Sequence, residues 1–182
     1  MRRFHIQNFG CRATQADGAA LEGLLQGRGL EQGAPADADL VILNTCTVTA
    51  TADDDLRKSV HRVRRENPGA RILVTGCYAQ RAPEEIAALE GVTWVVGNSH
   101  KTQIAEIVFD TEYHSQVHIG EIGAQDEFLA APVSEAPGGR TRPNLKIQDG
   151  CSNVCSFCII PSVRGRSRSM RLEEVIAQVR GL

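Results

Sequence analysis

Residues 70–77 have the sequence ARILVTGC, an apolar run of strand length that ends in a cysteine. Similar runs occur twice earlier in the chain, because residues 3–11 are RFHIQNFGC and residues 40–46 are LVILNTC. Short apolar runs bounded by turn residues are typical of buried strands. The sequence therefore predicts three strands, whose carboxyl ends carry Cys11, Cys46 and Cys77.

Helical patterns separate these strands. Residues 16–26 place leucines on one face, and residues 53–66 open with three aspartates and then repeat apolar residues at helical spacing. A short helix is expected after Pro83, and a fourth unit pairs a strand at 92–96 with a helix that contains Val108. Alternation of strands and helices, with nearly continuous apolar strands, favours a parallel sheet covered by helices. We therefore predict an α/β fold.

The three strand-end cysteines are candidate metal ligands. The carboxyl ends of parallel strands share one edge of the sheet, where ligands collect, so the thiols are expected to converge. A single cysteine after a strand is commonly an inert core residue. Three at equivalent positions, with no other cysteine before residue 151, favour a shared metal site. None of the histidines occupies such a position, and none is proposed as a ligand: His5, His61, His100, His114 and His118.

A second set of cysteines lies in residues 147–169, IQDGCSNVCSFCIIPSVRGRSRS, where the spacing C-x3-C-x2-C is formed by Cys151, Cys155 and Cys158. Structural zinc sites use four protein ligands. An iron–sulfur cube held by three thiolates instead leaves one iron open to a small molecule. Both triads fit the second arrangement better. The spacing, with Phe157 before the last cysteine, resembles the cluster motif of radical S-adenosylmethionine (SAM) enzymes, which implies that the open iron binds SAM.

Length and composition limit the class of protein. The chain of 182 residues can hold one large domain or two small ones, and 42% hydrophobic residues suffice for a packed core. No stretch approaches the ~20 apolar residues that span a bilayer. The opening MRRFHIQNFG lacks the apolar run of a signal peptide. We therefore expect a cytoplasmic protein without a membrane partner, whose cysteines serve metal binding rather than disulfides.

Charge is distributed unevenly along the chain. Residues 1–139 carry 12 Lys and Arg against 19 Asp and Glu, whereas residues 140–182 carry 8 against 3. A basic segment suits an anionic partner such as RNA, although short arginine-rich stretches are often solvated loops. Arg164, Arg166 and Arg168 could pair with RNA phosphate or the SAM carboxylate, or could face solvent. The basic positions in residues 57–65 favour a solvated helix surface.

Four segments together resemble the methylthiotransferase family: FGC at 9–11, LNTCTVT at 43–49, VTGCYAQ at 74–80, and KIQDGC with CIIPSVRGRSRS at 146–169. The resemblance covers essentially the whole chain and corresponds to the N-terminal portion of the family. It implies two [4Fe-4S] clusters, an auxiliary one on Cys11, Cys46 and Cys77 and a SAM-binding one on Cys151, Cys155 and Cys158.

Family members add a methylthio group to a modified adenosine next to the tRNA anticodon or to a ribosomal-protein aspartate. Residues 44–53 (NTCTVTATAD) and 10–17 (GCRATQAD) are most similar to the threonylcarbamoyladenosine branch, although Ala13, Thr14 and Ala16 depart from its pattern. The resemblance therefore implies a tRNA substrate modified at C2, an electron donor and a sulfur donor, and no DNA. Alternatives are an isopentenyladenosine substrate, a ribosomal-protein substrate, and a non-catalytic iron–sulfur or zinc module.

The expected domain organisation has three parts. Residues 1–115 form the N-terminal methylthiotransferase domain, residues 116–140 a linker that contains APVSEAPGG, and residues 141–182 the start of a radical SAM (β/α) barrel. That start comprises a strand at 144–149, the cysteine loop and a helix at 171–180. Because the family's barrel is longer, we expect this polypeptide alone to be truncated, to leave apolar edges unpaired and to lack turnover.

Overall fold

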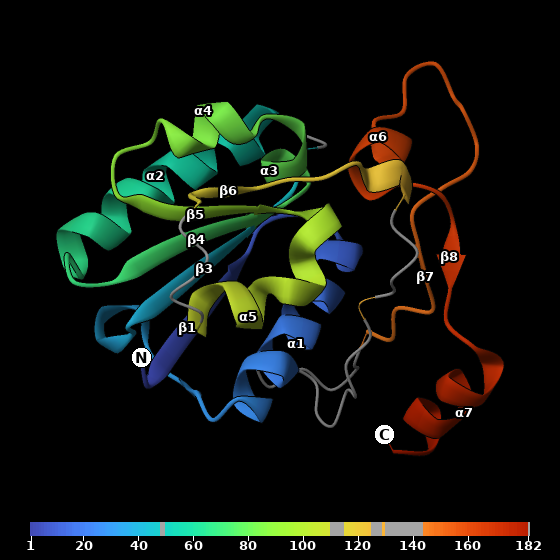
Figure 1. Ribbon diagram of the computed structural model, residues 1–182, viewed down its shortest axis with the longest axis horizontal. Coiled ribbons are helices and arrows are strands. Elements are labelled where there is room, and N and C mark those ends of the chain that lie inside the picture. Colours follow the sequence, from blue (N-terminus) through green and yellow to red (C-terminus); the bar gives the residue numbers. More distant parts are fainter. Residues whose placement is uncertain (48–49, 110–114, 125–128, 130–143, 182) are drawn as a thin grey trace.

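The computed structural model describes residues 1–47, 50–109, 115–124, 129 and 144–181 (Figure 1). His114 and the predicted linker stretch APVSEAPGG at 131–139 lie outside these residues.

Six parallel strands form a single sheet in the order β2-β1-β3-β4-β5-β6. Their bounds are β1 Arg3–Asn8, β2 Glu31–Gln32, β3 Leu40–Thr45, β4 Arg71–Gly76, β5 Val92–Gly97 and β6 Val117–His118. The predicted parallel sheet is thus confirmed, and its three cysteine-bearing strands, β1, β3 and β4, are direct neighbours. The chain leaves β1 toward β2 on one side and returns to β3 on the other, which makes the β1/β3 boundary a topological switch point.

Helices cover both faces of the sheet (Figure 1). They are α1 Arg12–Gly27, α2 Ala50–Glu66, α3 Cys77–Arg81, α4 Pro83–Ala87 and α5 Ile104–Phe109, with 3-10 turns η1 Pro35–Asp37, η2 Asn98–Gln103 and η3 Ile122–Ala124. Side chains of α1 and α5 pack on one face around Phe4, Leu21 and Ile107. Side chains of α2, α3 and α4 pack on the other face, around Leu43 and Val60. These two apolar layers fix the sheet and therefore the positions of its strand ends.

Several boundaries differ from the predicted ones. Helix α1 begins at Arg12, four residues earlier than expected, because Cys11 is its N-cap with an extended backbone. The helix after β4 begins at Cys77 itself, where the sequence predicted a helix only from Pro83. Strands β2 and β6 have two residues each and carry no apolar run to predict them. Because β6 lies in the segment predicted as linker, the sheet extends beyond residue 115.

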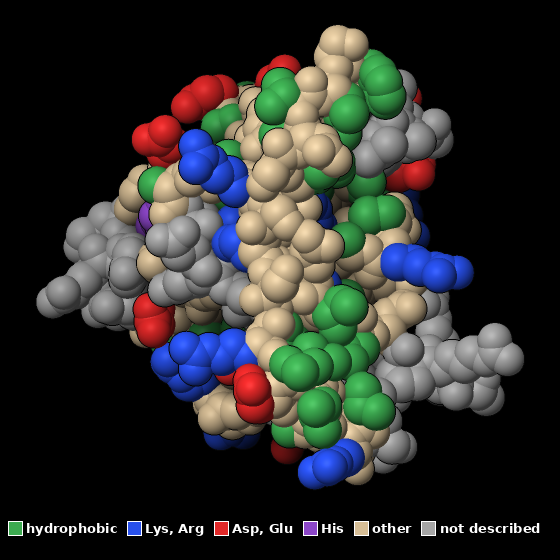
Figure 2. Space-filling view, turned by 90° about the vertical axis from the view of Figure 1, so that its right-hand side faces the viewer, with side chains coloured by type: hydrophobic (Ala, Val, Ile, Leu, Met, Phe, Trp, Pro, Cys, Tyr) green, Lys and Arg blue, Asp and Glu red, His purple; other side chains and the backbone are tan. Residues whose placement is uncertain are grey.

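Residues 144–181 lie beside the sheet's domain (Figure 1). They contain β7 Gln148–Asp149, α6 Ile160–Arg164, β8 Arg168–Ser169 and α7 Leu172–Arg180. The predicted helix at 171–180 is confirmed, whereas the predicted strand at 144–149 is reduced to β7, which pairs with β8 in antiparallel fashion. This part exposes large apolar side chains: Ile147, Val154, Phe157, Ile159, Leu172, Ile176 and Val179. Figure 2 views the molecule from the side on which this part lies, and hydrophobic side chains gather on that face.

Two glycines let the ends of β1 and β4 approach the end of β3. Gly10 and Gly76 both have φ of +104°, a conformation that side chains with a Cβ rarely adopt. A Cβ on Gly10 would overlap the Cys46 side chain, and a Cβ on Gly76 would overlap the Thr45 backbone. The backbone on both sides therefore closes on residues 45–46, which carry the central cysteine.

Replacing Gly76 with alanine should lower the free energy of unfolding by about 2–4 kcal/mol, since both the positive φ and the overlap with backbone are costly. The measurement is urea unfolding followed by circular dichroism. Gly27→Ala is the matched control, because a Cβ at Gly27 meets nothing within 4 Å. We expect this variant to be unchanged or stabilised by up to about 1 kcal/mol. Equal stability of the two variants would contradict the close packing at residues 45–46.

Candidate metal centre

The first cysteine triad lies at the carboxyl edge of β1, β3 and β4. In the strand register Asn8 pairs with Asn44, and Thr45 pairs with Gly76, so Cys46 and Cys77 leave adjacent strands at the same level. Cys11 follows β1 on the other side of β3. Cys46 and Cys77 are buried, Cys11 is exposed, and all three thiols are free. The sheet thus brings together the strand ends that the sequence singled out.

Cys11 lies in a setting that favours its thiolate. Its Sγ is 3.5 Å from the Thr14 hydroxyl, and Cys11 is the N-cap of α1. Burial on its own would raise the pKa of the Cys11 thiol, but the bonds to Thr14 and the charge of Arg164 lower it below the ordinary value. A thiolate is the form that binds metal, and helix N-termini and cationic neighbours favour it.

Cys77 is linked to the C-terminal part of the chain through Asn98. The Asn98 side-chain amide approaches Cys77 Sγ at 3.6 Å and also donates to the Val163 carbonyl oxygen at 2.7 Å. Val163 belongs to α6, which follows the second triad. One amide group therefore joins a ligand candidate of the first triad to the segment that carries the second.

The second triad lies in the loop between β7 and α6. Cys151 and Cys158 are half-buried and Cys155 is exposed. The Cys151 amide donates to the Gly165 carbonyl oxygen at 3.0 Å, and the Cys158 amide donates to the Cys155 carbonyl oxygen at 3.1 Å. A cavity of about 450 Å³ beside Cys151 is lined by Gly123, Cys151, Ser152, Val154, Pro161, Gly165 and Arg166. Its volume falls in the range of small-molecule sites, about 300–1,000 Å³.

Between the two triads lies a buried set of charges, here called the ionic ring: Asp17, Lys146, Asp149 and Arg164. Arg164 donates from Nη2 to Asp17 Oδ2 at 2.9 Å and from Nη1 to Asp149 Oδ1 at 2.8 Å. Lys146 Nζ donates to Asp17 Oδ1 at 2.5 Å and to Asp149 Oδ2 at 3.1 Å. Each cation thus bridges the same two carboxylates, and the Asp17 side chain is only 1% exposed.

The sheet's domain completes this network. Lys101 Nζ donates to Asp17 Oδ2 at 2.9 Å and lies 3.5 Å from Asn44 Oδ1, and the Asn44 amide donates to Asn8 and to the Thr14 carbonyl oxygen. Burial on its own would raise the pKa of the Asp17 carboxyl, but Lys101, Arg164 and Lys146 hold it well below its ordinary value. Asp17 is therefore a carboxylate at neutral pH, fully compensated by its neighbours.

The arginines after the second triad do not share one environment. Arg164 is 4% exposed and ion-paired, so the prediction that it faces solvent or an external anion is wrong. Its burial would lower its pKa, but Asp17, Cys77 and Asp149 raise it, so the guanidinium is charged. Arg166 is exposed beside the Cys151 cavity. The basic positions on α2 are mostly solvated, and their pairs include Arg57–Glu85 and Arg64–Glu90.

The residues of the first triad fit a thiolate-bound metal cluster by donor type and position. Thr47 Oγ1, one residue after Cys46, and Thr75 Oγ1, two residues before Cys77, are buried without a hydrogen-bond partner. Hydroxyls of this kind can donate to an inorganic or thiolate sulfur. Within the described ranges, however, no three His, Cys, Asp or Glu side chains are gathered as a ready ligand cage. The three thiols therefore lie at one edge of the sheet, but they do not converge into a ligand cage as the sequence predicted.

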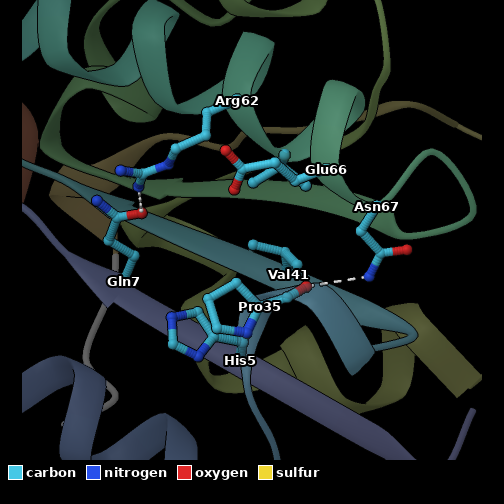
Figure 3. A pocket seen from close by; sticks show the side chains of 8 residues that line it. His5, Gln7, Pro35, Val41, Arg62, Glu66 and Asn67 are labelled. Atoms are coloured by element: carbon cyan, nitrogen blue, oxygen red, sulfur yellow. Dashed lines mark hydrogen bonds between the residues drawn. The ribbon is translucent and has the colours of Figure 1, made fainter.

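A second cavity, of about 250 Å³, lies on the α2 face of the sheet (Figure 3). Its lining residues are His5, Gln7, Pro35, Val41, Arg62, Val63, Glu66 and Asn67. Arg62 points across it and donates to the Gln7 amide oxygen at 3.0 Å, and Asn67 donates to the Pro35 carbonyl oxygen at 3.0 Å. These polar groups satisfy one another, and no cysteine lines this cavity, so it is separate from the metal centre.

The chain is thus an α/β protein with two cysteine triads. One triad lies at the carboxyl edge of its parallel sheet, and the other lies in the segment that packs beside the sheet. A family model described as "Uncharacterized protein family UPF0004" matches residues 3–97, the region of the first triad. The threonylcarbamoyladenosine tRNA methylthiotransferase MtaB of Aquifex aeolicus (strain VF5) is 38% identical over 180 residues, 96% of this chain and 43% of the relative. The protein of that name from Bacillus subtilis (strain 168) is 39% identical over 185 residues, 98% and 40% respectively.

A third relative has a different name. The tRNA-2-methylthio-N(6)-dimethylallyladenosine synthase of Citrifermentans bemidjiense is 31% identical over 192 residues, 100% of this chain and 42% of the relative. The chain thus spans about two fifths of the length of the curated relatives it matches. The chain belongs to the UPF0004 family, and the predicted resemblance to methylthiotransferases is confirmed. No helix among the described residues is long and apolar enough to cross a membrane.

Sequence reasoning missed the residues that connect the triads. The sequence does not single out Asp17, Lys101, Lys146 or Asp149, and Thr14 stands out only as a departure from a family pattern. One signal was available, because Asp17 lies four and eight residues before Leu21 and Leu25 on the apolar face of α1. A charge on the buried face of a helix indicates a specific partner.

Replacing Asp17 with asparagine should lower the free energy of unfolding at pH 7 by about 3–5 kcal/mol, because the buried cations lose their counter-charge. The folded-state pKa of Asp17 is depressed, so its contribution is present at neutral pH and is lost as the pH falls below its ordinary value of about 4. The difference between wild type and variant should therefore narrow between pH 5 and pH 2, measured by urea unfolding at each pH.

The exposed Asp37 supplies the control, since Asp37→Asn should leave stability nearly unchanged at every pH. A difference between wild type and Asp17→Asn that stays constant down to pH 2 would contradict the assignment of a buried carboxylate.

Proposed function

We propose that this chain is the cluster-bearing portion of a radical SAM methylthiotransferase that adds a methylthio group to C2 of a modified adenosine next to the tRNA anticodon. The observation that carries the proposal is that residues 163–165 are connected to both cysteine triads. The Val163 carbonyl oxygen accepts a hydrogen bond from Asn98, which also contacts Cys77, and the Gly165 carbonyl oxygen accepts a hydrogen bond from the Cys151 amide. Relatives whose names describe methylthio modification of tRNA align with 96–100% of this chain and support the proposal.

The proposed cofactors are two [4Fe-4S] clusters and SAM. Cys11, Cys46 and Cys77 would hold the auxiliary cluster, and Cys151, Cys155 and Cys158 the SAM-binding one. Three thiolates leave one iron of each cube open, which suits a sulfur ligand at one site and SAM at the other. The cluster held by Cys151, Cys155 and Cys158 would supply the one-electron reduction of SAM on which hydrogen abstraction from an unactivated carbon depends. Such chemistry is required because a hydrogen on a purine ring carbon is not acidic enough for a protein base.

The chain's own residues prepare these sites. Thr14 and the N-terminus of α1 favour the thiolate of Cys11, and Asn98 orients Cys77 by a bond to its sulfur. Arg164 places a buried positive charge near both cysteines, which favours the negative charge of a thiolate-bound cluster. The cavity beside Cys151 would receive SAM, with the exposed Arg166 at its wall as a partner for a carboxylate or an RNA phosphate.

The proposed substrate is N6-threonylcarbamoyladenosine. Relatives named for that nucleoside are 32–39% identical to this chain, whereas relatives named for the dimethylallyl nucleoside are 31–33% identical. The reaction would need tRNA, an electron donor and a sulfur donor, in the cytoplasm. Residues 1–115, extended by β6, would form the auxiliary-cluster domain, the following residues to 140 the linker, and residues 141–182 the beginning of the radical SAM domain.

The test is methylthiolation by the full-length protein, reconstituted anaerobically and supplied with SAM, a reductant and tRNA that carries threonylcarbamoyladenosine without the methylthio group. We expect mass spectrometry of the nucleosides to detect the methylthio product. Cys77→Ala and Cys155→Ala should each reduce its yield more than about 100-fold, since loss of a ligand exceeds the effect of an outer-shell change.

His61→Ala, on the exposed face of α2, is the control and should retain full activity. Modification only of isopentenyladenosine in tRNA, or only of a ribosomal-protein aspartate, would contradict the proposed substrate. A chain that binds clusters yet modifies none of the three would favour a non-catalytic iron–sulfur module.

A further inference from the structure

The ionic ring ties together the two parts of the chain that carry the cysteine triads. Asp17 lies on α1, six residues after Cys11, whereas Asp149 lies two residues before Cys151. We propose that the ring positions the two triads relative to each other and that Arg164 is its positioning residue. The inference rests on the proposed function only in taking both triads as cluster ligands.

Arg164 lies between two residues whose backbones are hydrogen-bonded toward different triads. Its neighbour Val163 accepts a hydrogen bond from Asn98, whose amide also contacts Cys77. Its other neighbour, Gly165, accepts a hydrogen bond from the Cys151 amide. A displacement of Arg164 would therefore shift the contact to Cys77 and the contact to Cys151 at the same time.

The guanidinium of Arg164 has a geometry that can fix the orientation of the two parts of the chain. A guanidinium presents parallel donors in a rigid fork, and here its two Nη atoms serve two carboxylates from different parts of the chain. Lys146 bridges the same pair with a single ammonium, which reinforces the contact without the fixed geometry. The ring thus sets an orientation, not only a distance.

Energetics favour a positioning role over a purely stabilising one. Buried ion pairs recover little more than their desolvation cost, and well-packed apolar residues of similar volume are often as stable. Apolar packing, however, tolerates sliding and rotation, whereas a closed ring of directional bonds permits one arrangement. Radical chemistry between two bound groups depends on such placement, because small displacements of reacting groups reduce rates strongly.

The first experiment measures amide hydrogen exchange in the 182-residue chain without metal. In Arg164→Gln we expect the amides of Cys151 and Met170, which bond within residues 147–170, to exchange about 100-fold faster. The amides of β3 and β4 should change less than about twofold, since the sheet has its own core. Arg164→Lys should give an intermediate rate, because an ammonium lacks the fork.

Arg166→Gln is the matched control, since it removes an exposed arginine from the same segment and should leave all these rates unchanged. Unchanged exchange in Arg164→Gln, or equal acceleration in Arg166→Gln, would overturn the proposal. Equal acceleration in β3 and β4 would overturn it as well, because Arg164 would then support the whole fold rather than the docking of one part.

The second experiment records electron paramagnetic resonance of the chain reconstituted with iron and sulfide and then reduced. Two nearby paramagnetic clusters broaden each other's lines, and we expect this interaction to weaken in Arg164→Gln and to persist in Arg166→Gln. Identical spectra of the two variants would contradict positioning by the ring. If the wild-type chain takes up no cluster, the proposed function fails, whereas the exchange experiment still decides whether the ring holds the two parts together.

Discussion

The structure depends on the parallel pairing of β1, β3 and β4, which fixes where three cysteines leave the sheet. Parallel strands end at a common edge, so residues far apart in the sequence meet there without a dedicated loop. Gly10 and Gly76 bring the ends of β1 and β4 closer to the end of β3, because only glycine allows the flanking backbone to pack against residues 45–46. The apolar layers on both faces of the sheet pack against the strands that form this edge.

A second constraint is electrostatic. Carboxylates and cations from α1, η2 and the segment around the second triad are buried together, and each charge is compensated by a named partner. Burial on its own would raise the pKa of the Cys11 thiol, but Arg164, one of these buried cations, helps to lower it. The fold of the sheet's domain and the docking of the C-terminal part therefore share one set of side chains.

The sequence predicts what depends on local pattern and misses what depends on distant partners. Apolar runs such as ILV in β4 and the cysteine spacing of 151–158 are local, and they led to the α/β sheet and the family. The burial of Arg164 was not predicted, because its partner Asp17 lies 147 residues away in the sequence. The two-residue strands β2 and β6 likewise owe their structure to neighbouring strands, since they carry no apolar pattern of their own.

We propose that the sheet edge formed by β1, β3 and β4 presents Cys11, Cys46 and Cys77 as one ligand set, independent of the second triad. Its most direct test is iron counting after anaerobic reconstitution of the chain with iron and sulfide, with the cysteines of one triad changed to alanine at a time. We expect about eight irons in the wild-type chain and about four in either triple variant. A Cys11/Cys46/Cys77→Ala variant that retains all the iron, or a wild-type chain that binds only zinc, would contradict it.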